Sequence, residues 1–238
     1  KAGCIAVPTM PLLRARELGT IAGRARVDAV LCAASLRAEV DAIEPGGLPM
    51  LLFDGEHASD SLEARMAAHD APFIAPDTAA DDVCLISFTS GTTGVPKGTM
   101  HFHRDLLAIC DCFPRHTLRS RMDDVFIGTP PLAFTFGLGG LLLFPLRVGA
   151  SAVLIEKLTP DSLLAAIQEH RATVCFTAPT FYRQMAQLAD RFDLSSLTRS
   201  VSAGEALPVA TRAAWKEASG LEMIDGIGAT EMLHIFIS

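Results

Sequence analysis

The chain has 238 residues, of which 50% are hydrophobic and 20% charged, and its formal net charge is -7 at pH 7. This length allows one large domain or two small ones, each with a buried core. Acidic residues are scattered among Arg and Lys without a basic stripe, which argues against a nucleic-acid partner. No apolar run approaches the roughly 20 residues of a membrane-spanning helix, so we expect a soluble protein without a membrane partner.

The six cysteines mostly stand inside apolar runs, where a free thiol behaves as a small hydrophobic side chain. This usage suits a reducing compartment, so the sequence predicts a cytoplasmic protein. The chain starts at Lys1 without a Met and ends within the apolar residues 233–237. Ends of this kind favour the interpretation that the chain is a piece of a longer protein.

Short apolar or β-branched runs alternate with segments of helical period along the chain. The runs that predict strands are 28–33, 83–88, 125–128, 152–155, 173–177 and 200–202. The segments that predict helices are 14–26, 61–69, 104–112, 161–169, 180–190 and 208–219, with Pro160 and Pro208 at positions where a first helical turn tolerates proline. This alternation predicts an α/β fold with mainly parallel sheets flanked by helices, and a ligand site at the carboxyl ends of the strands.

The expected strand at 83–88 leads into a loop rich in glycine and hydroxyl side chains. The loop reads Thr89-Ser90-Gly91-Thr92-Thr93-Gly94-Val95-Pro96-Lys97-Gly98. Its glycines let backbone N–H groups point at an anion, and Lys97 adds positive charge, so the loop predicts a phosphate site. A Walker A loop is excluded because Pro96 precedes the lysine and Gly98 follows it. A surface loop that is only rich in Gly and Thr is the alternative.

These ten residues resemble the phosphate-binding signature of the adenylate-forming superfamily, which includes acyl- and aryl-CoA ligases, luciferases and the adenylation domains of peptide synthetases. The resemblance implies that the loop holds the β- and γ-phosphates of ATP while an acid attacks the α-phosphate. It gives a nucleotide-binding role to Thr89, Ser90, Gly91, Thr92, Thr93, Gly94 and Lys97. Lys97 would also assist the reaction by ordering or closing the loop.

Two further segments resemble nucleotide-binding signatures of the same superfamily. Residues 202–208 are similar to the loop whose backbone borders the adenine, which implies that Gly204, Glu205 and Ala206 contact the base. Alone this segment is weak, since a Gly before a helix is commonly only a turn.

Residues 225–231 resemble the motif that closes the nucleotide site. In that motif Thr230 meets the α-phosphate and Glu231 binds Mg²⁺, a hard cation that favours carboxylate oxygens. The alternative for Glu231 is a solvated helix turn. Asp225 would accept a hydrogen bond from the adenine amino group, and Ile227 stands where many members have an aromatic residue. The resemblance also assigns the flanking glycines Gly226 and Gly228 and the hydroxyl of Thr230 to the nucleotide.

The resemblance also implies a pocket for the acid. The Pro-rich turn 130–140 places Phe134 at the gate of this pocket, beside Ala133, although Phe134 and Phe136 could instead be ordinary core residues. Gly228 and His234 would line the same pocket. A lone His in an apolar run is as readily a satisfied core residue.

Residues 230–236, 202–208 and 131–140 are similar to the benzoate and 2-aminobenzoate CoA ligase branch. The resemblance implies that ATP and Mg²⁺ activate a small aromatic acid to an acyl-adenylate, which coenzyme A then takes up. One alternative is a ligase for another carboxylic acid, such as a fatty acid. A second is a nucleotide-binding module that has no chemistry.

The resemblance covers nearly the whole chain, whereas the family polypeptide is about twice as long. It implies an incomplete first α/β subdomain at 1–82, a truncated nucleotide- and acid-binding subdomain at 83–238, and a mobile C-terminal domain that this sequence does not contain. Because that domain supplies a lysine to the adenylation step, we expect this chain alone to be inactive.

One group of potential metal ligands suggests a different site. It comprises His101, His103, Cys110, Cys112 and His116. Single-residue gaps do not match zinc-binding pairs, and a helix would place the two cysteines on different faces. His103 is better interpreted as the start of the helix after the phosphate loop.

Overall fold

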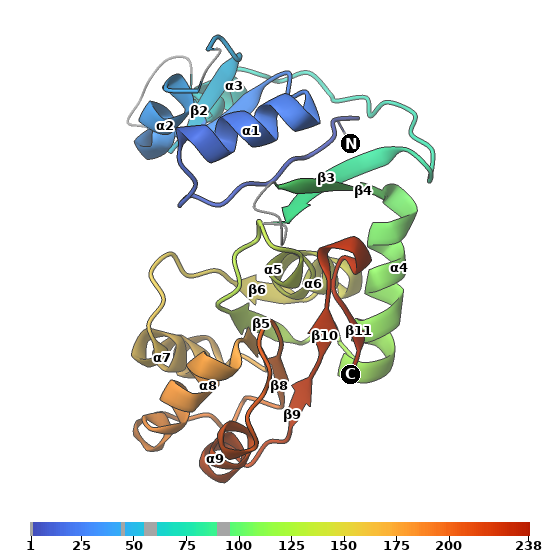
Figure 1. Ribbon diagram of the computed structural model, residues 1–238. Coiled ribbons are helices and arrows are strands. Elements are labelled where there is room, and N and C mark those ends of the chain that lie inside the picture. Colours follow the sequence, from blue (N-terminus) through green and yellow to red (C-terminus); the bar gives the residue numbers. More distant parts are fainter. Residues whose placement is uncertain (1, 44–45, 55–60, 90–95) are drawn as a thin grey trace. The chain divides into compact units, whose positions relative to one another are not determined.

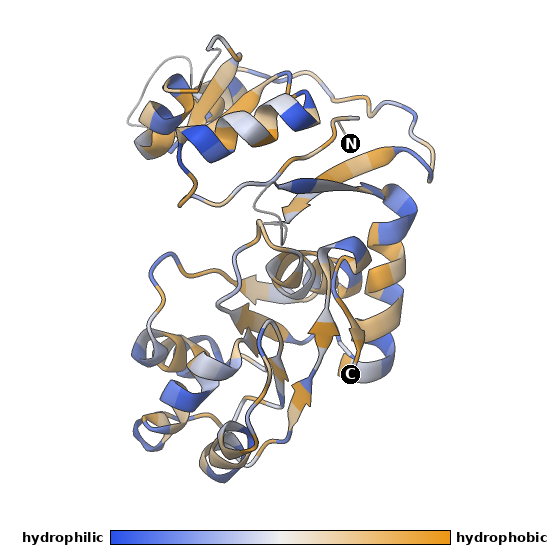
Figure 2. Cartoon of the chain, in the orientation of Figure 1, coloured by the Kyte–Doolittle hydropathy of each residue, from blue (hydrophilic) through white to orange (hydrophobic). Residues whose placement is uncertain are grey.

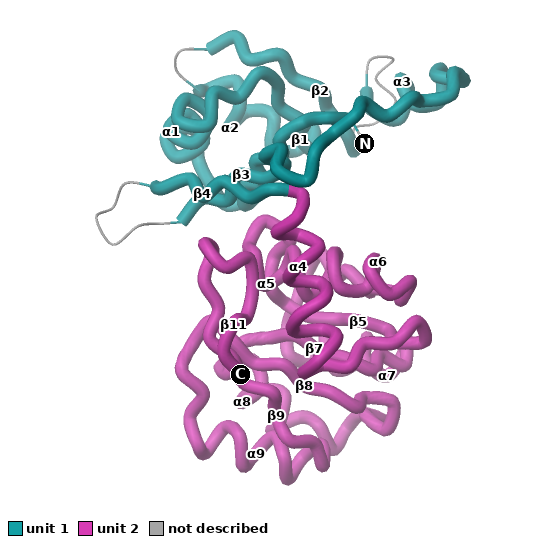
Figure 3. The backbone as a smooth tube through the Cα atoms, turned by 90° about the vertical axis from the view of Figure 1, so that its right-hand side faces the viewer, with its two compact units in different colours: residues 1–102 teal, residues 103–238 magenta. Residues whose placement is uncertain are grey.

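The computed structural model describes residues 2–43, 46–54, 61–89 and 96–238, and the chain divides into two compact units, residues 1–102 and 103–238 (Figure 3). The division falls later than the subdomain boundary predicted after residue 82, and that boundary stays a prediction. Within the described residues, every helix is too short or too polar for a membrane crossing.

Unit 1 contains two separate strand pairs among its described residues. Its elements are α1 (Ala15–Ala25), β1 (Val30–Ala33), η1 (Ala34–Leu36), α2 (Arg37–Asp41), β2 (Met50–Phe53), α3 (Leu62–Ala67), β3 (Val83–Thr89) and β4 (Lys97–Phe102) (Figure 1). Strands β1 and β2 are parallel, with Val30 opposite Met50. Strands β3 and β4 are antiparallel, which departs from the predicted run of parallel βαβ units. Strand β4 was not predicted.

Unit 2 is built on a five-stranded sheet in the order β6-β5-β7-β8-β9, with every neighbouring pair parallel. Its strands are β5 (Val125–Gly128), β6 (Ser151–Val153), β7 (Val174–Thr177), β8 (Arg199–Ser202) and β9 (Met223–Asp225). Strand β7 is buried along its whole length, as expected for a strand covered on both faces. The predicted α/β fold with a mainly parallel sheet is therefore confirmed.

Helices cover both faces of this sheet (Figure 1). They are α4 (His103–Phe113), α5 (Thr135–Leu138), α6 (Phe144–Val148), α7 (Pro160–His170), α8 (Pro179–Ala186) and α9 (Val209–Ser219), with shorter turns η2 (Pro114–Leu118), η3 (Gly139–Leu143) and η4 (Ala189–Arg191). Pro160 opens α7 as predicted. Pro208 precedes α9 in an extended conformation, so α9 starts one residue later than predicted.

Two cores lie on opposite faces of the sheet because successive strand residues alternate between faces. The first core joins Ile127, Cys175 and Met223 to α7, α8 and α9. In this core the rings of Tyr182 and Trp215 pack with centroids 4.9 Å apart.

The second core, on the other face, joins Phe126, Val174, Phe176 and Val201 to residues of α4, η3 and α6. Helix α4 carries both apolar and polar residues in Figure 2, and its buried residues are Cys110 and Phe113. An amphipathic helix of this kind covers one face of a sheet and leaves its polar side in water.

The chain ends in a short antiparallel pair that was not predicted. Strand β10 (Ile227–Gly228) pairs with β11 (Ile235–Ile237), and the 3-10 turn η5 (Thr230–Met232) lies between them. Figure 1 shows this pair continuing from the end of β9.

Candidate functional site

Polar side chains stand at the carboxyl ends of four neighbouring strands of unit 2. Thr129 follows β5, and Thr177, Ser202 and Asp225 end β7, β8 and β9. The register places Thr177 opposite Ser202 and Ser202 opposite Asp225, while the hydroxyls of Thr129 and Thr177 lie 2.5 Å apart. The two loops that the sequence assigned to the nucleotide therefore start from adjacent positions at the edge where α/β folds bind ligands.

The first of these loops, residues 203–206, turns sharply after β8. Gly204 has φ +89°, a conformation that side-chain-bearing residues rarely adopt, although no described atom lies within 4 Å of a Cβ built there. Glu205 and Ala206 are exposed. The Thr180 hydroxyl donates a hydrogen bond of 2.7 Å to Oε2 of Glu205, a contact that no sequence motif indicates.

The second segment, residues 226–228, consists of Gly226 and strand β10 and is held close to β8 and β11. The N–H of Gly226 donates to the Ser202 carbonyl at 3.0 Å. A Cβ on Gly226 would come within 2.5 Å of Ile235, so only glycine fits there without a shift of that side chain. Ile227 is 62% exposed and therefore available to an aliphatic contact with a flat ligand.

Thr230 and Glu231 lie in η5, between the strands of the terminal pair. Thr230 is half-buried and Glu231 is exposed. Among the described residues, no group of three or more His, Cys, Asp or Glu side chains could hold a metal. An exposed single carboxylate fits Mg²⁺ only as one of several ligands, the others being waters and substrate phosphates.

The predicted phosphate loop belongs to unit 1. Thr89, the last residue of β3, pairs with Lys97, the first of β4, so the two ends of the loop are held together. Lys97 is exposed. The intervening predicted residues Ser90, Gly91, Thr92, Thr93 and Gly94 lie outside the described residues. Arg24 in the last turn of α1 donates to the Pro96 carbonyl at 3.1 Å, a contact that the sequence did not indicate.

The turn before α5 presents the predicted gate residue to solvent. Phe134 precedes α5 and is 50% exposed, so its interpretation as a core residue is wrong. Phe136 does pack in the second core, with its ring 5.6 Å from that of Phe176. Ala133 is half-buried. A Cβ on Gly137 would come within 2.2 Å of the Pro131 carbonyl, so this turn requires glycine.

His234 is buried among four aromatic rings. Its ring centroid lies 5.5 Å from those of Phe113 and Phe136, 4.5 Å from Phe144 and 6.0 Å from Phe176. Neither ring nitrogen makes a hydrogen bond of ordinary geometry within the described part of the chain. Burial lowers the pKa of His234 to about 4, although the nearby backbone of Phe136 raises it to a lesser extent. The imidazole is therefore neutral at pH 7.

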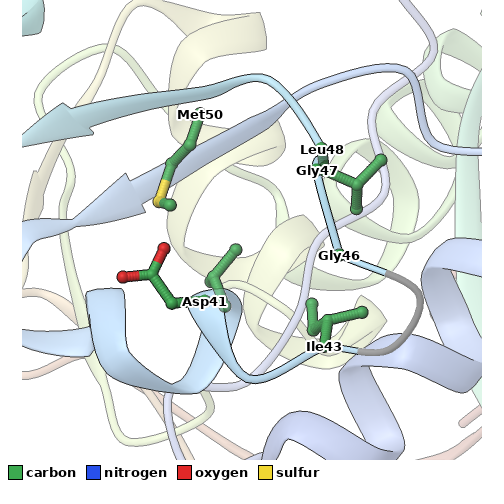
Figure 4. A pocket seen from close by; sticks show the side chains of 7 residues that line it. Asp41, Ile43, Gly46, Gly47, Leu48 and Met50 are labelled. Atoms are coloured by element: carbon green, nitrogen blue, oxygen red, sulfur yellow. The ribbon is translucent and has the colours of Figure 1, made fainter.

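Two other features of the chain lie apart from these residues. A cavity of about 120 Å³ in unit 1 is lined by Val40, Asp41, Ile43, Gly46, Gly47, Leu48 and Met50, none of them predicted site residues (Figure 4). The group suggested as zinc ligands is split, because Cys110 is buried and Cys112 exposed. Burial raises the pKa of Cys110 to about 11, which disfavours the thiolate that zinc requires.

The family model described as AMP-binding enzyme matches residues 1–238 of this chain. The chain belongs to the AMP-binding enzyme family. Benzoate-CoA ligase from Thauera aromatica is 40% identical over 194 residues, which cover 80% of this chain and 37% of that protein. Anthranilate-CoA ligase from Pseudomonas aeruginosa is 32% identical over 247 residues, which cover 99% of this chain and 46% of that protein.

Solved structures of this AMP-binding family share the fold. The anthranilate CoA ligase AuaEII in complex with anthranoyl-AMP superposes with a TM-score of 0.90 at 34% identity, over 98% of this chain and 46% of that one. The benzoate CoA ligase from Burkholderia xenovorans LB400 superposes with a TM-score of 0.84 at 32% identity, over 96% of this chain and 46% of that one. The predicted resemblance to the benzoate and 2-aminobenzoate branch is thereby confirmed, and the chain spans less than half the length of these relatives.

Proposed function

We propose that this chain is the nucleotide-binding part of an aryl-CoA ligase, which activates benzoate or 2-aminobenzoate with ATP and transfers the acyl group to coenzyme A. The proposal depends chiefly on one observation, the register that makes Ser202 and Asp225 neighbours at the carboxyl edge of the sheet. The membership of the AMP-binding family and the names of the relatives support it.

Each predicted nucleotide residue has a role in this proposal. The loop from Thr89 to Gly98 would hold the phosphates of ATP, and Lys97 would add positive charge there. The loops 203–206 and 226–228 would border the adenine, with Asp225 accepting from its amino group. Thr230 would contact the α-phosphate, and Glu231 would bind Mg²⁺, which neutralises phosphate charge when it is bound.

The surroundings of His234 support an aromatic substrate. Phe136, which is half-buried beside His234, offers an apolar surface that suits a flat aryl group, whereas Phe113, Phe144 and Phe176 are buried in the second core. A buried polar atom without a partner costs about 1–3 kcal/mol, so a ligand atom that hydrogen-bonds to the neutral imidazole would gain that amount. The ortho amino group of 2-aminobenzoate is one such ligand. Ala133, Phe134 and Gly228 would complete the acid pocket.

The reaction comprises two displacements at the proposed site. An oxygen of the aryl carboxylate attacks the α-phosphorus, the bond to the β-phosphate breaks, and pyrophosphate leaves. The coenzyme A thiol loses its proton and attacks the carbonyl carbon of the acyl-adenylate, and AMP leaves. Because the chain covers only 37% and 46% of two ligases, we propose that it turns over little or no substrate alone.

Acid-dependent exchange of labelled pyrophosphate into ATP tests this proposal in the full-length protein that carries the chain. Benzoate, 2-aminobenzoate, a medium-chain fatty acid and an amino acid are compared side by side. Exchange with the aryl acids, abolished by Glu231→Gln, is expected. Exchange only with the fatty acid or the amino acid would overturn the substrate class, and exchange with none would favour a nucleotide-binding module.

A further inference from the structure

The carboxyl ends of β7 and β8 are joined beyond the sheet by one side-chain contact. Thr177 and Ser202 face each other at the ends of these strands. Three residues further along each segment, the Thr180 hydroxyl donates to Oε2 of Glu205 at 2.7 Å. Thr180 lies in the first turn of α8, and Glu205 lies in the loop that the proposed function assigns to adenine. The contact therefore joins a helix to a ligand-binding loop.

This contact holds the loop on the side of β7. On the side of β9, the backbone bond from Gly226 to the Ser202 carbonyl holds the start of the loop. The Ser202 hydroxyl is fully buried and has no hydrogen-bond partner in the described residues, so it does not anchor residues 203–206. Gly204, at φ +89°, is a point where the backbone has unusual freedom. Because Gly204 allows several backbone conformations, a side-chain contact is needed to keep residues 203–206 in one of them.

The position of the contact also favours the carboxylate electrostatically. The first turn of a helix carries partial positive charge, so the Glu205 carboxylate is stabilised beside the start of α8. A carboxylate held there keeps residues 203–206 beside the first turn of α8. Both residues are exposed, so their bond adds little to the stability of the fold. Its effect should appear in ligand binding.

We propose that Thr180 is a positioning residue for ATP. By holding the Glu205 carboxylate at the first turn of α8, it fixes residues 203–206 in the conformation that receives the adenine. The inference depends on the proposed function, because it assigns a role to a neighbour of the same site. In this proposal Thr180 acts on ATP through Glu205.

The test uses three threonine variants of the full-length protein. Thr180→Val removes the hydroxyl at nearly constant size, and Thr180→Ser keeps it. Thr198→Val is the control, because the hydroxyl of exposed Thr198 also makes side-chain hydrogen bonds, donating to the Thr173 carbonyl at 3.0 Å and accepting from Nε of Arg199 at 3.1 Å, but at the amino end of β8. The equilibrium dissociation constant for MgATP and the KM and kcat of pyrophosphate exchange are measured for each, together with the melting temperature.

We expect Thr180→Val to raise the Kd and the KM for ATP by about 3- to 10-fold, as the loss of one charged hydrogen bond near water implies. The kcat, the KM for the acid and the melting temperature should change little. Thr180→Ser should restore ATP affinity to within about twofold, since its hydroxyl can make the same bond. Glu205→Ala combined with Thr180→Val should weaken ATP binding no more than the stronger single variant, because each removes the same bond.

Two results would overturn the inference: unchanged ATP affinity in Thr180→Val, or an equal loss in Thr180→Ser or Thr198→Val. These results are separate from a failure of the proposed function. If the wild-type protein binds MgATP but exchanges pyrophosphate with no acid, the ligase proposal fails while the Kd comparison still decides the role of Thr180. If it binds no MgATP, both fail.

Discussion

The backbone of Gly139 lies directly against the imidazole of His234. A Cβ built on Gly139 would come within 2.4 Å of Cδ2 of that ring, a distance that real side chains essentially never show. Gly139 starts the turn η3, and its neighbour Gly140 makes a similarly close approach to the ring of Phe176. The two glycines therefore let the buried rings of the second core approach the helix backbone.

Replacing Gly139 by alanine should displace His234. We expect Gly139→Ala to lower the free energy of unfolding by about 1–3 kcal/mol, as overpacking of a core does. The KM for the aryl acid should also rise, because the imidazole would lose its position. Gly23→Ala is the control: no described atom lies within 4 Å of a Cβ at Gly23 in α1, and alanine there should stabilise the helix by about 0.5–1 kcal/mol. Urea unfolding measures both variants, and equal stabilities would contradict the prediction.

His234 should make stability fall on acidification. Its pKa is about 4 in the folded chain, against 6.5 for an unperturbed histidine, so the unfolded chain binds a proton in a range where the folded chain does not. The stability that this group contributes is therefore present above pH 6.5 and is lost as the pH falls toward 4, below which the loss levels off. The free energy of unfolding should fall by up to about 1.4 kcal/mol per pH unit in this range, and by about 3 kcal/mol in total.

Proton NMR of the imidazole measures the pKa of His234 directly, and urea unfolding between pH 7 and pH 4 measures the slope. His234→Gln is the matched variant, since it removes the titrating group and keeps a polar side chain. The stability difference between wild type and His234→Gln should shrink as the pH falls. A His234 resonance that titrates near pH 6.5 would disprove the prediction.

The sequence predicted the centre of the sheet better than its margins. Residues 125–128 were predicted as a strand and form β5, because a strand covered on both faces is a continuous apolar run. Strands β2, β4, β9, β10 and β11 were missed. Each is short or contains Gly or charged residues, and each is fixed by pairing with another strand, which its own residue pattern does not encode.

The candidate site was predicted at the level of segments rather than contacts. The loops after Ser202 and Asp225 were assigned from their motifs, but their adjacency follows only from the order of the strands. The four aromatic rings around His234 come from α4, α5, α6 and β7, which are distant from it in the sequence. Its apolar neighbours in the sequence supported two interpretations equally, a residue of the acid pocket and a core residue. Contacts such as Thr180 to Glu205 combine residues from different elements.

Asp124 and Arg199 form a buried ion pair near the amino end of the sheet. Asp124 is 4% exposed and also accepts from the Thr173 hydroxyl at 2.8 Å, while Arg199 donates to the carbonyls of Leu118 and Arg119. Arg199→Met should lower the free energy of unfolding by about 3–5 kcal/mol, because it leaves a buried carboxylate without its charge partner.

The exposed pair of Lys216 and Glu222 provides the control for Arg199→Met. Both side chains are more than half exposed. Lys216→Met should change stability little, since water replaces the lost partner. Urea unfolding at pH 7 compares the two variants. Similar losses in both would show that burial does not determine the strength of these pairs.

Burial should also divide the cysteines into reactive and unreactive groups. It raises the pKa of Cys110 to about 11 and that of Cys175 to about 12, whereas Cys4 and Cys112 are exposed. The thiolate is the species that iodoacetamide alkylates, so at pH 7.5 the two buried thiols should react at least about 100-fold more slowly than Cys112. Peptide mass spectrometry over time measures each rate of alkylation, and unfolding in urea should make the rates equal.

Added Zn²⁺ should leave the alkylation rate of Cys112 unchanged. Protection of both Cys110 and Cys112 by the metal would support the zinc interpretation and contradict the split between a buried and an exposed thiol.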